Sequence, residues 1–539
     1  MRPRARPVLV AGLALVTLIG GLGYAAYLAT TREVPQAGGR MVEGLVVDGP
    51  LSLLPPFAAE TQNSRDLSSL LYRGLTRPGP DGRPGADLAT RWEIDPQARV
   101  YTFHLAAGLR WSDGQPLTSA DALFTLALLQ GDQLSGSLAG QAWANITAVA
   151  PDPATVVYTL PAPSAPFLGQ TSLGLVPAHA LNRRAPETLR AATDAPTSGP
   201  FMVGGVERDR LHLDRNPHAA LRPLLDGIDY RLFGSEDGAI AALVAGDIDM
   251  VASILPKDAA RLAGRANRGV LRSGSFAYAQ VLLNQAQGAL ADAQVRRALA
   301  AAVDRQAIVR DDLGGYARLD SSPIPPTITW ASAKTPGPAH NLAAAANALD
   351  ASGWKLPAGG RVRQKDGVPL SLHLAAPDSD PYPAVAQSVA RDLARAGIAV
   401  KVDVYPQVRL LSDVLAGRKF DMALTPIDNG PDPDVYIFWH SAVAGAPSYN
   451  FSGMARDVFL DKDLEDGRFN PDMKARADAY ADAQKILAAN QPAVFLYCPD
   501  VIIGVNQRLR GVTLPAGMEP GGRYASVTGW YVQTRRVKR

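Results

Sequence analysis

Helix-like and strand-like segments alternate through the C-terminal half of this chain, and this alternation restricts the possible folds more than any other feature. Apolar residues spaced by three or four positions predict helices, and short runs of β-branched and apolar residues predict strands. The helices are predicted at residues 342–352, 384–396 and 476–489, and the strands at 370–374, 400–404 and 422–424. Such alternation is typical of α/β layers with partly parallel sheets.

A further amphipathic helix is predicted over Asp292–Arg310. Val295, Leu299 and Val303 are spaced by four and would form its apolar face. This segment lies upstream of the alternating region and extends the α/β pattern toward the middle of the chain.

An uncharged apolar run, Val8–Leu28, follows three arginines near the start of the chain. Its 21 residues would cross a hydrocarbon core of about 30 Å as a helix rising about 1.5 Å per residue. A cleaved signal peptide is the alternative, although its apolar region is usually shorter. We therefore expect a membrane anchor or signal at 1–31, a tether at 32–40, and export of the remainder.

The charge balance and the single cysteine exclude several classes of protein. Lys and Arg number 54 against 51 Asp and Glu, and three arginines before the apolar run account for the net charge of +3. Residues 32–539 therefore sum to zero, whereas nucleic-acid binding needs a clustered basic surface. Cys498 permits neither an intrachain disulfide nor a cysteine-based metal site, and we expect it as a buried thiol on a strand.

No catalytic or metal-binding motif is present in the sequence. HExxH, P-loop and GxSxG patterns are absent, and none of the 7 histidines lies three or four residues from another. The sequence therefore predicts no catalytic residue, no cofactor and no metal site.

An acidic segment, Asp428–Asp434, is the most informative candidate site. Its three carboxylates and two prolines come directly after the predicted strand at 422–424. A carboxylate held at a strand end and shielded by aromatic rings would bind an ammonium group through charge-assisted hydrogen bonds. The nearby aromatic residues are Tyr436, Phe438, Trp439, Tyr449 and Phe451. The alternatives are a solvated acidic turn capped by its own Asp side chains, and a calcium loop, whose EF-hand spacing does not match.

Several short motifs occur in a characteristic order along the chain. They are LLYRGLT at 70–76, YTFHL at 101–105, GLRWSDGQPLT at 108–118, SGPF at 198–201, GDID at 246–249, LLN at 282–284, VRRAL at 295–299, AVDR at 302–305 and YNFSG at 449–453. Together they resemble the family 5 extracellular solute-binding proteins, which are the oligopeptide-, dipeptide- and nickel-binding receptors of ABC importers. The resemblance covers about residues 43–533.

The resemblance implies an α/β, two-lobed clamp like that of periplasmic binding proteins (class II, cluster C), with an extra domain inserted in lobe one. Lobe one would comprise residues 41–75, 200–280 and 498–539, the inserted domain 76–199, and lobe two 281–497. Strands crossing near Gly274–Leu283 and Phe495–Ile503 would form the hinge. Closure of the lobes around a ligand is the implied switching mode.

The resemblance also implies the residues that bind the ligand. In peptide-binding members, an aspartate in a segment similar to 428–433 holds the amino terminus of the ligand, which assigns Asp428 as the amine anchor. Because Pro431 is an extra residue in this segment, Asp432 is the alternative anchor. Typical relatives have a tyrosine where Gln280 stands, so the pocket is expected to differ from theirs. The expected ligand-binding residues are Asp428, Asp432, Asn429, Tyr449, Phe451, Gln280 and Tyr436, with Tyr449 and Phe451 placed either in the cleft wall or in the core.

These features predict a non-enzymatic receptor that captures a short peptide or similar small cationic solute and delivers it to an ABC permease. We expect a monomer on the outer side of the bacterial cytoplasmic membrane, anchored there by residues 8–28. The alternatives are a membrane-fixed ligand sensor that signals to a partner protein, a receptor for a nickel complex or a sugar, and a secreted hydrolase on the same scaffold.

Overall fold

The structure is a computed structural model that describes residues 29–538 with several gaps. The residues left out within this range are 48, 50, 59–60, 80, 266, 333–336 and 444–448. The apolar run predicted as a membrane anchor, residues 8–28, lies outside the described residues. None of the helices that are described is both long enough and apolar enough to cross a membrane.

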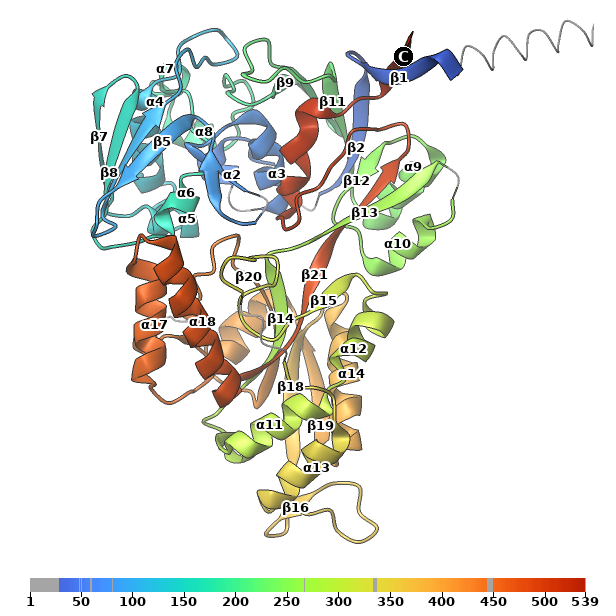
Figure 1. Cartoon of the computed structure of the whole chain (residues 1–539). Coiled ribbons are helices and arrows are strands. Elements are labelled where there is room, and N and C mark those ends of the chain that lie inside the picture. The colour runs from blue at the N-terminus through green and yellow to red at the C-terminus, as the bar shows by residue number, and fades with distance from the viewer. Residues whose placement is uncertain are drawn as a thin grey trace, which may run out of the picture.

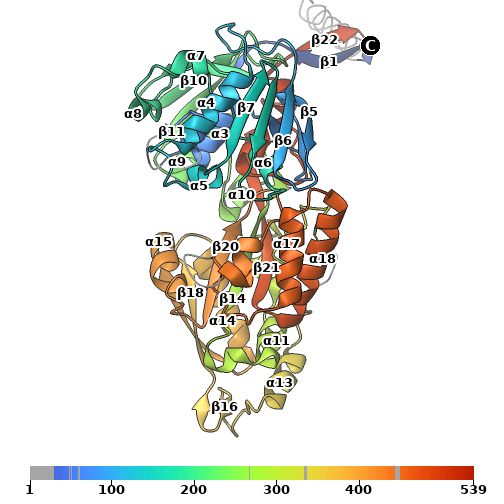
Figure 2. The same cartoon turned by 90° about the vertical axis from the view of Figure 1, so that its left-hand side faces the viewer.

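Two lobes, drawn one above the other in Figures 1 and 2, share one mixed sheet of twelve strands. The strand order is β19-β18-β20-β14-β21-β12-β2-β11-β10-β9, and β13 and β15 also pair with β21. The bounds are β2 (Arg40–Val46), β9 (Phe201–Val206), β10 (Arg210–Arg215), β11 (Gly227–Phe233), β12 (Met250–Val251), β13 (Arg268–Gly274), β14 (Ala277–Leu283), β15 (Ala317–Leu319), β18 (Ser371–Pro377), β19 (Ala399–Tyr405), β20 (Met422–Asp428) and β21 (Ala493–Asn506). The predicted α/β architecture is confirmed.

The long strand β21 passes from the lower lobe into the upper lobe. Its first half pairs with β14, where Val494 lies opposite Val281. Its second half pairs with β13, where Ile503 lies opposite Leu271. Because only residues 275–276 separate β13 from β14, the chain crosses between the lobes at two adjacent positions.

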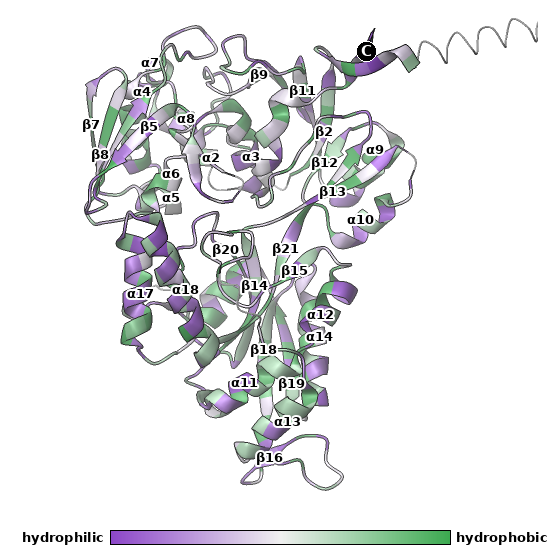
Figure 3. Cartoon of the chain, in the orientation of Figure 1, coloured by the Kyte–Doolittle hydropathy of each residue, from purple (hydrophilic) through white to green (hydrophobic). Residues whose placement is uncertain are grey.

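In the lower lobe, helices cover both faces of the sheet. Val281 and Leu283 pack with α11 (Ala293–Ala302), α13 (Leu342–Ala351) and α14 (Tyr382–Arg395). Leu282 faces the opposite way and packs with α17 (Val458–Phe469), α18 (Met473–Asn490) and the π-helical turn η3 (Leu410–Leu415). Figure 3 shows hydrophobic and hydrophilic residues alternating along α17 and α18, as expected of helices with one buried side.

The upper lobe contains a second, four-stranded sheet beside the large one. Its strand order is β5 (Ala89–Ile94), β6 (Val100–Leu105), β8 (Thr155–Thr159) and β7 (Thr147–Asp152). Helix α4 (Ser119–Gln130) begins with a reciprocal capping box formed by Thr118 and Asp121. Trp111, which donates to the carboxylate of Asp121 at 3.3 Å, is completely buried and therefore packs within the lobe.

The remaining upper-lobe elements are shorter or lie at its edges. They are α2 (Pro55–Ala58), α3 (Gln62–Leu71), α5 (Leu138–Ala142), α6 (Phe167–Gln170), α7 (Ala178–Leu181), α8 (Pro186–Leu189), α9 (Glu236–Ala245), α10 (Pro256–Leu262), the 3-10 helix η5 (Pro520–Gly529) and the strand pairs β1 (Thr31–Gln36) with β22 (Gln533–Lys538) and β3 (Thr76–Pro78) with β4 (Pro84–Ala86). The lower lobe adds η1 (Gly288–Ala291), α12 (Arg305–Ala307), the π-helical turn η2 (Ile308–Asp312), α15 (Gln407–Arg409), α16 (Tyr436–Trp439), η4 (Ser441–Val443) and the strand pair β16 (Gln364–Lys365) with β17 (Val368–Pro369).

The prediction of one continuous helix over Asp292–Arg310 is wrong. Helix α11 ends at Ala302, because Val303 adopts extended dihedral angles of −78° and 123°. Asp304 then caps a separate short helix by accepting a hydrogen bond from the backbone of Ala307 at 2.9 Å. The apolar spacing was correct, since Val295, Leu299 and Val303 are all buried, but this local cap interrupts the helix.

Candidate ligand-binding site

A cavity of about 230 Å³ lies in the lower lobe beside strands β14 and β20. These two strands form one side, and residues of the segments at 407–415, 438–439 and 449–451 form the others. The lining residues are Gln280, Leu282, Gln407, Leu410, Leu411, Leu415, Thr425, Pro426, Ile427, Asp428, Phe438, Trp439, Tyr449 and Phe451. The cavity thus has mostly apolar walls with a small number of polar groups, as ligand pockets usually do.

Four of the seven residues expected from the sequence line this cavity. Gln280 comes from β14, Asp428 ends β20, and Tyr449 and Phe451 follow α16. The ring of Tyr449 lies 6.2 Å from that of Phe451 and 6.0 Å from that of Phe438, measured between centroids. The aromatic rings therefore form a contiguous wall.

Asp428 occupies an exposed position at the rim of the cavity. Its carboxylate accepts a hydrogen bond from the backbone N–H of Gly430 at 3.1 Å. Within the described part of the chain, no Lys or Arg lies at ion-pair distance from Asp428. Its negative charge is consequently available to a ligand.

The other three expected residues lie in or just after the turn that follows β20 and do not line the cavity. Asn429 donates to the backbone oxygens of Asp432 and Asp434 at 3.1 and 2.7 Å. Asp432 pairs with Arg476 at 2.7 Å, and the Arg476 side chain is only 4% exposed. Tyr436 stacks on His440, with 4.2 Å between the ring centroids. The charge of Asp432 is therefore already neutralised inside the lower lobe.

Glu519 in the upper lobe faces the same turn and was not found by sequence reasoning. A β-carbon placed on Gly430, which has a φ of +69°, would lie 3.3 Å from Oε1 of Glu519. Burial, together with the nearby negative charge of Asp428, raises the pKa of Glu519 to about 7. No local motif surrounds Glu519, so only the fold reveals that it lies near Asp428 across the lobes.

The lobes also touch at other positions. Some of these contacts lie beside this turn, and one lies on the opposite side of the molecule. A β-carbon on Gly82, whose φ is +82°, would lie 2.7 Å from the backbone oxygen of Pro431, so a side chain there would collide. The backbone of Ala165 donates to that of Arg468 at 2.9 Å. On the other side, Lys257 and Asp380 form an exposed ion pair at 2.9 Å.

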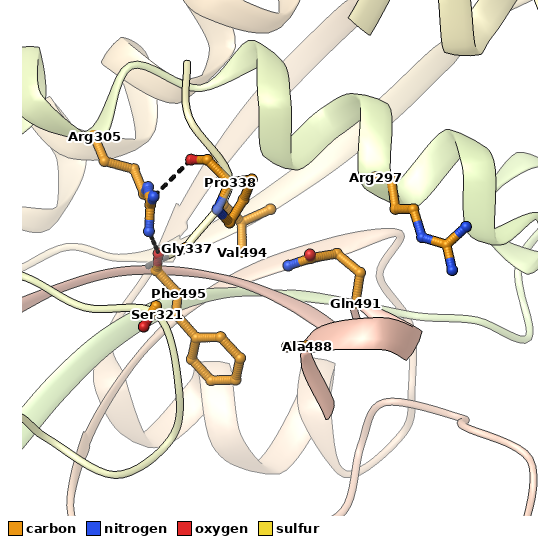
Figure 4. Close-up of a pocket in the computed structure, with 9 residues that line it drawn as sticks. All are labelled: Arg297, Arg305, Ser321, Gly337, Pro338, Ala488, Gln491, Val494 and Phe495. Carbon is orange, nitrogen blue, oxygen red and sulfur yellow. Dashed lines mark hydrogen bonds between the residues drawn. The ribbon is translucent and has the colours of Figure 1, made fainter. Parts of the chain in front are cut away.

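A second cavity of about 320 Å³ lies elsewhere in the lower lobe (Figure 4). Arg305 in its wall donates to the backbone oxygens of Asp320, Phe495 and Pro338 at 2.6, 3.3 and 2.7 Å. None of the seven expected site residues lines this cavity. The buried arginine of this second cavity already donates its hydrogen bonds to the backbone. The first cavity is therefore the better candidate for ligand binding.

Comparisons with known proteins agree with this architecture. Residues 83–448 match the family described as bacterial extracellular solute-binding proteins, family 5 Middle. Protein XP55 from Streptomyces lividans is 31% identical over 476 residues, which cover 85% of each chain. Because the match spans more than half of the sequence, this chain belongs to the family 5 extracellular solute-binding proteins.

Solved structures show the same two-lobed α/β fold. The oligopeptide-binding protein AppA from Bacillus subtilis, in complex with a nonapeptide, has a TM-score of 0.70 at 23% identity, covering 93% of this chain and 100% of that one. NikZ from Campylobacter jejuni, in complex with Ni(L-His), has a TM-score of 0.72 at 23% identity, covering 91% and 99%. The family comprises extracytoplasmic binding proteins for peptides, nickel or other solutes that work with ABC importers.

Proposed function

We propose that this protein captures an amine-bearing solute, such as a short peptide, by closure of its lobes and delivers it to an ABC permease. The carrying observation is the position of Asp428, unpaired at the rim of an aromatic-lined cavity and opposite Glu519 of the upper lobe. A protonated amine at this point would not pair with one carboxylate alone. It would bridge both. Charge-assisted hydrogen bonds to both would then stabilise the closed arrangement.

Two like charges facing each other across the lobes also explain why closure would require a ligand. When Asp428 and Glu519 are both ionised and the space between them is empty, their repulsion disfavours the approach of the lobes. A cationic group reverses the sign of this interaction. The ligand would therefore bind the closed state better than the open one, which is the condition for a ligand-driven population shift.

The proposed hinge consists of the two strand crossings between the lobes. We assign lobe one to residues 41–75, 200–280 and 498–539, the inserted domain to 76–199, and lobe two to 281–497. The pairing of β21 with β14 in the lower lobe and with β13 in the upper lobe supports a crossing near these limits, with β14 and its Gln280 on the lower-lobe side. Residues 275–276 and the middle of β21 would absorb the dihedral changes of closure.

The membrane anchor at residues 8–28 and the monomeric state remain proposals from the sequence. An uncleaved anchor would keep the receptor close to its permease and raise the effective concentration of bound solute there. It would equally suit a membrane-fixed sensor, in which a partner protein responds to closure.

Native mass spectrometry of the full-length chain with a mixed library of dipeptides to pentapeptides would test the proposal. Half of the library would carry free amino termini and half would be N-acetylated. We expect only free-amine peptides to be retained, and expect Asp428→Asn to lose them. Asp432→Asn is the matched control, because it removes a carboxylate of the same turn that is already paired. Equal retention of acetylated peptides, or undiminished retention by Asp428→Asn, would refute the proposed function.

A further inference from the structure

Three side chains in the wall of the cavity described above have a buried polar atom without a partner among the described residues: Trp439 at Nε1, and Gln280 and Thr425 on the two adjacent strands. Gln280 on β14 is 2% exposed and Thr425 on β20 is 7% exposed. Among the described residues, neither Oε1 of Gln280 nor Oγ1 of Thr425 has a hydrogen-bond partner. Buried polar atoms are almost always satisfied, so three such atoms lining one cavity require an explanation, and the two on the adjacent strands lie closest to a shared position.

The sheet register places these two side chains beside each other. Gln280 and Thr425 are directly opposed across the antiparallel pair of β14 and β20. Directly opposed residues of an antiparallel pair project from the same face of the sheet, with β-carbons about 4.5–5.5 Å apart. The acceptor of Gln280 and the hydroxyl of Thr425 therefore form one polar patch within otherwise apolar walls.

We propose that this cavity is a selective subsite for a ligand group with an apolar or aromatic body and a hydroxyl at its tip, of which a phenol is the best match. The hydroxyl would donate to Oε1 of Gln280 and accept from the hydroxyl of Thr425, because one hydroxyl group can do both. The aromatic rings of Phe438, Tyr449 and Phe451 would contact the body of the group. A ligand lacking the hydroxyl would leave both buried atoms unpaired.

The size of the cavity and its position relative to Asp428 determine which part of the ligand enters it. Its 230 Å³ is below the roughly 300–1,000 Å³ of pockets that hold a whole drug-sized molecule. The cavity therefore holds one side chain. Asp428 lies three residues beyond Thr425 on β20, or about 10 Å along the strand, at the rim of the same cavity. Resting on the proposed amine recognition at Asp428, the inference assigns the subsite to the side chain of the amino-terminal residue.

Three tripeptides measured by isothermal titration calorimetry on the full-length protein would test this subsite. They are Tyr-Ala-Ala, Phe-Ala-Ala and N-acetylated Tyr-Ala-Ala. We expect Tyr-Ala-Ala to bind at least tenfold more tightly than Phe-Ala-Ala, since a site built to hydrogen-bond a hydroxyl discriminates against the analogue that lacks it. Equal affinity for Tyr-Ala-Ala and Phe-Ala-Ala would overturn the subsite. Equal affinity for the acetylated peptide would instead overturn the amine recognition on which it rests.

The variants Thr425→Val and Gln280→Met separate selectivity from folding. Each keeps the approximate shape of the side chain and removes one polar atom. We expect each to abolish the preference for tyrosine over phenylalanine while the melting temperature of the ligand-free protein stays the same or rises, because an unpaired buried polar group is removed. Retention of the tenfold preference in both variants would contradict the proposed contacts.

Discussion

A buried polar cluster in the upper lobe and the polar wall of the lower-lobe cavity differ in how their groups are satisfied. In the upper lobe, Arg523 is 1% exposed and forms an ion pair with Glu43 at 2.9 Å and another with Asp66. The hydroxyl of Tyr524 donates to Glu43 at 2.8 Å and accepts from Arg523 at 2.6 Å. In the lower lobe, Gln280 is buried to a similar extent, but its amide oxygen has no partner among the residues described.

This difference distinguishes buried polar groups that stabilise the fold from those that are available to bind a ligand. The Arg523 network joins β2, α3 and η5, and its charged groups pair with one another, so it stabilises a particular packing of these elements. It also fixes η5, at whose start Glu519 faces the lower lobe. The unpaired atoms beside β20 contribute nothing comparable to stability, and a ligand that pairs them gains that interaction on binding.

The largest effect is expected from Arg523→Met, which tests whether the buried network of the upper lobe contributes to stability. Two buried carboxylates, Glu43 and Asp66, would then lose their cationic partner, and breaking a buried ion pair typically costs about 3–5 kcal/mol. We expect the midpoint of urea unfolding to fall accordingly. The exposed Arg310→Met is the matched control and should leave the midpoint unchanged. A stability equal to that of the wild type would show that the network does not hold the upper lobe together.

Asp320 tests an intermediate case, a buried carboxylate that is half satisfied. Its Oδ1 accepts from the backbone of Ser321 at 2.8 Å, whereas its Oδ2 has no partner within the described structure. Burial raises the pKa of Asp320 to about 7. The folded state therefore holds a proton that the unfolded chain releases near pH 4, so stability falls as the pH rises between these values.

Relative to Asp320→Asn, the free energy of unfolding of the wild type should fall by about 1.4 kcal/mol per pH unit between about pH 4 and 7, and then level off. Urea unfolding of both proteins across this range would measure the difference. Parallel pH profiles for the two proteins would show that Asp320 does not titrate in this way.

Asp428 and Asp432 allow the comparison to be sharpened within one turn. Asp432→Asn removes the anionic partner of the buried Arg476, so we expect stability to fall by about 1.5–3 kcal/mol, the usual contribution of a hydrogen bond to a charged group. Peptide affinity should stay within about twofold of the wild-type value.

Asp428→Asn should have the opposite pattern. We expect an unchanged melting temperature and a peptide affinity weakened about 10- to 100-fold, since each 1.4 kcal/mol is tenfold. Calorimetric titration beside thermal unfolding measures both, and a shared pattern would mean that the two carboxylates have the same role.

Much of the fold could be predicted because periodicity is a local property. The helices predicted at 342–352, 384–396 and 476–489 correspond to α13, α14 and α18, and Cys498 is buried on β21 as expected. The strand predicted at 422–424 was too short, since β20 continues to Asp428. Pro426 in this segment interrupts the usual strand pattern, which concealed the extension.

The site was only partly predictable, because its geometry depends on residues far apart in the chain. Asp428 stood out through a local cluster of carboxylates, and Gln280 through its departure from typical relatives. Thr425 lies opposite Gln280 only because of the register between two strands that are distant in sequence. Glu519 reaches the turn from the other lobe. Neither relation leaves a local pattern, so neither residue could be identified from the sequence.

The smallest expected effect concerns the pH dependence that Glu519 gives to binding. With its pKa raised to about 7, Glu519 is neutral at pH 5.5 and largely ionised at pH 7.5. A protonated amine interacts favourably only with the ionised form, and the α-amino group of a peptide, with a pKa of about 7.7–8.0, stays mostly protonated over this range. The affinity for Tyr-Ala-Ala should therefore rise with pH, by up to about tenfold.

Glu519→Gln should remove this pH dependence and hold the affinity near the value that the wild type shows at pH 5.5. Titration calorimetry in two buffers with different ionisation enthalpies would also count the proton that Glu519 releases when the amine binds, because a nearby cation lowers its pKa. Asp428→Asn provides the contrast, with weak binding throughout this range. A flat profile in the wild type, or an unchanged slope in Glu519→Gln, would remove Glu519 from the ligand site and leave recognition of the amine to the lower lobe alone.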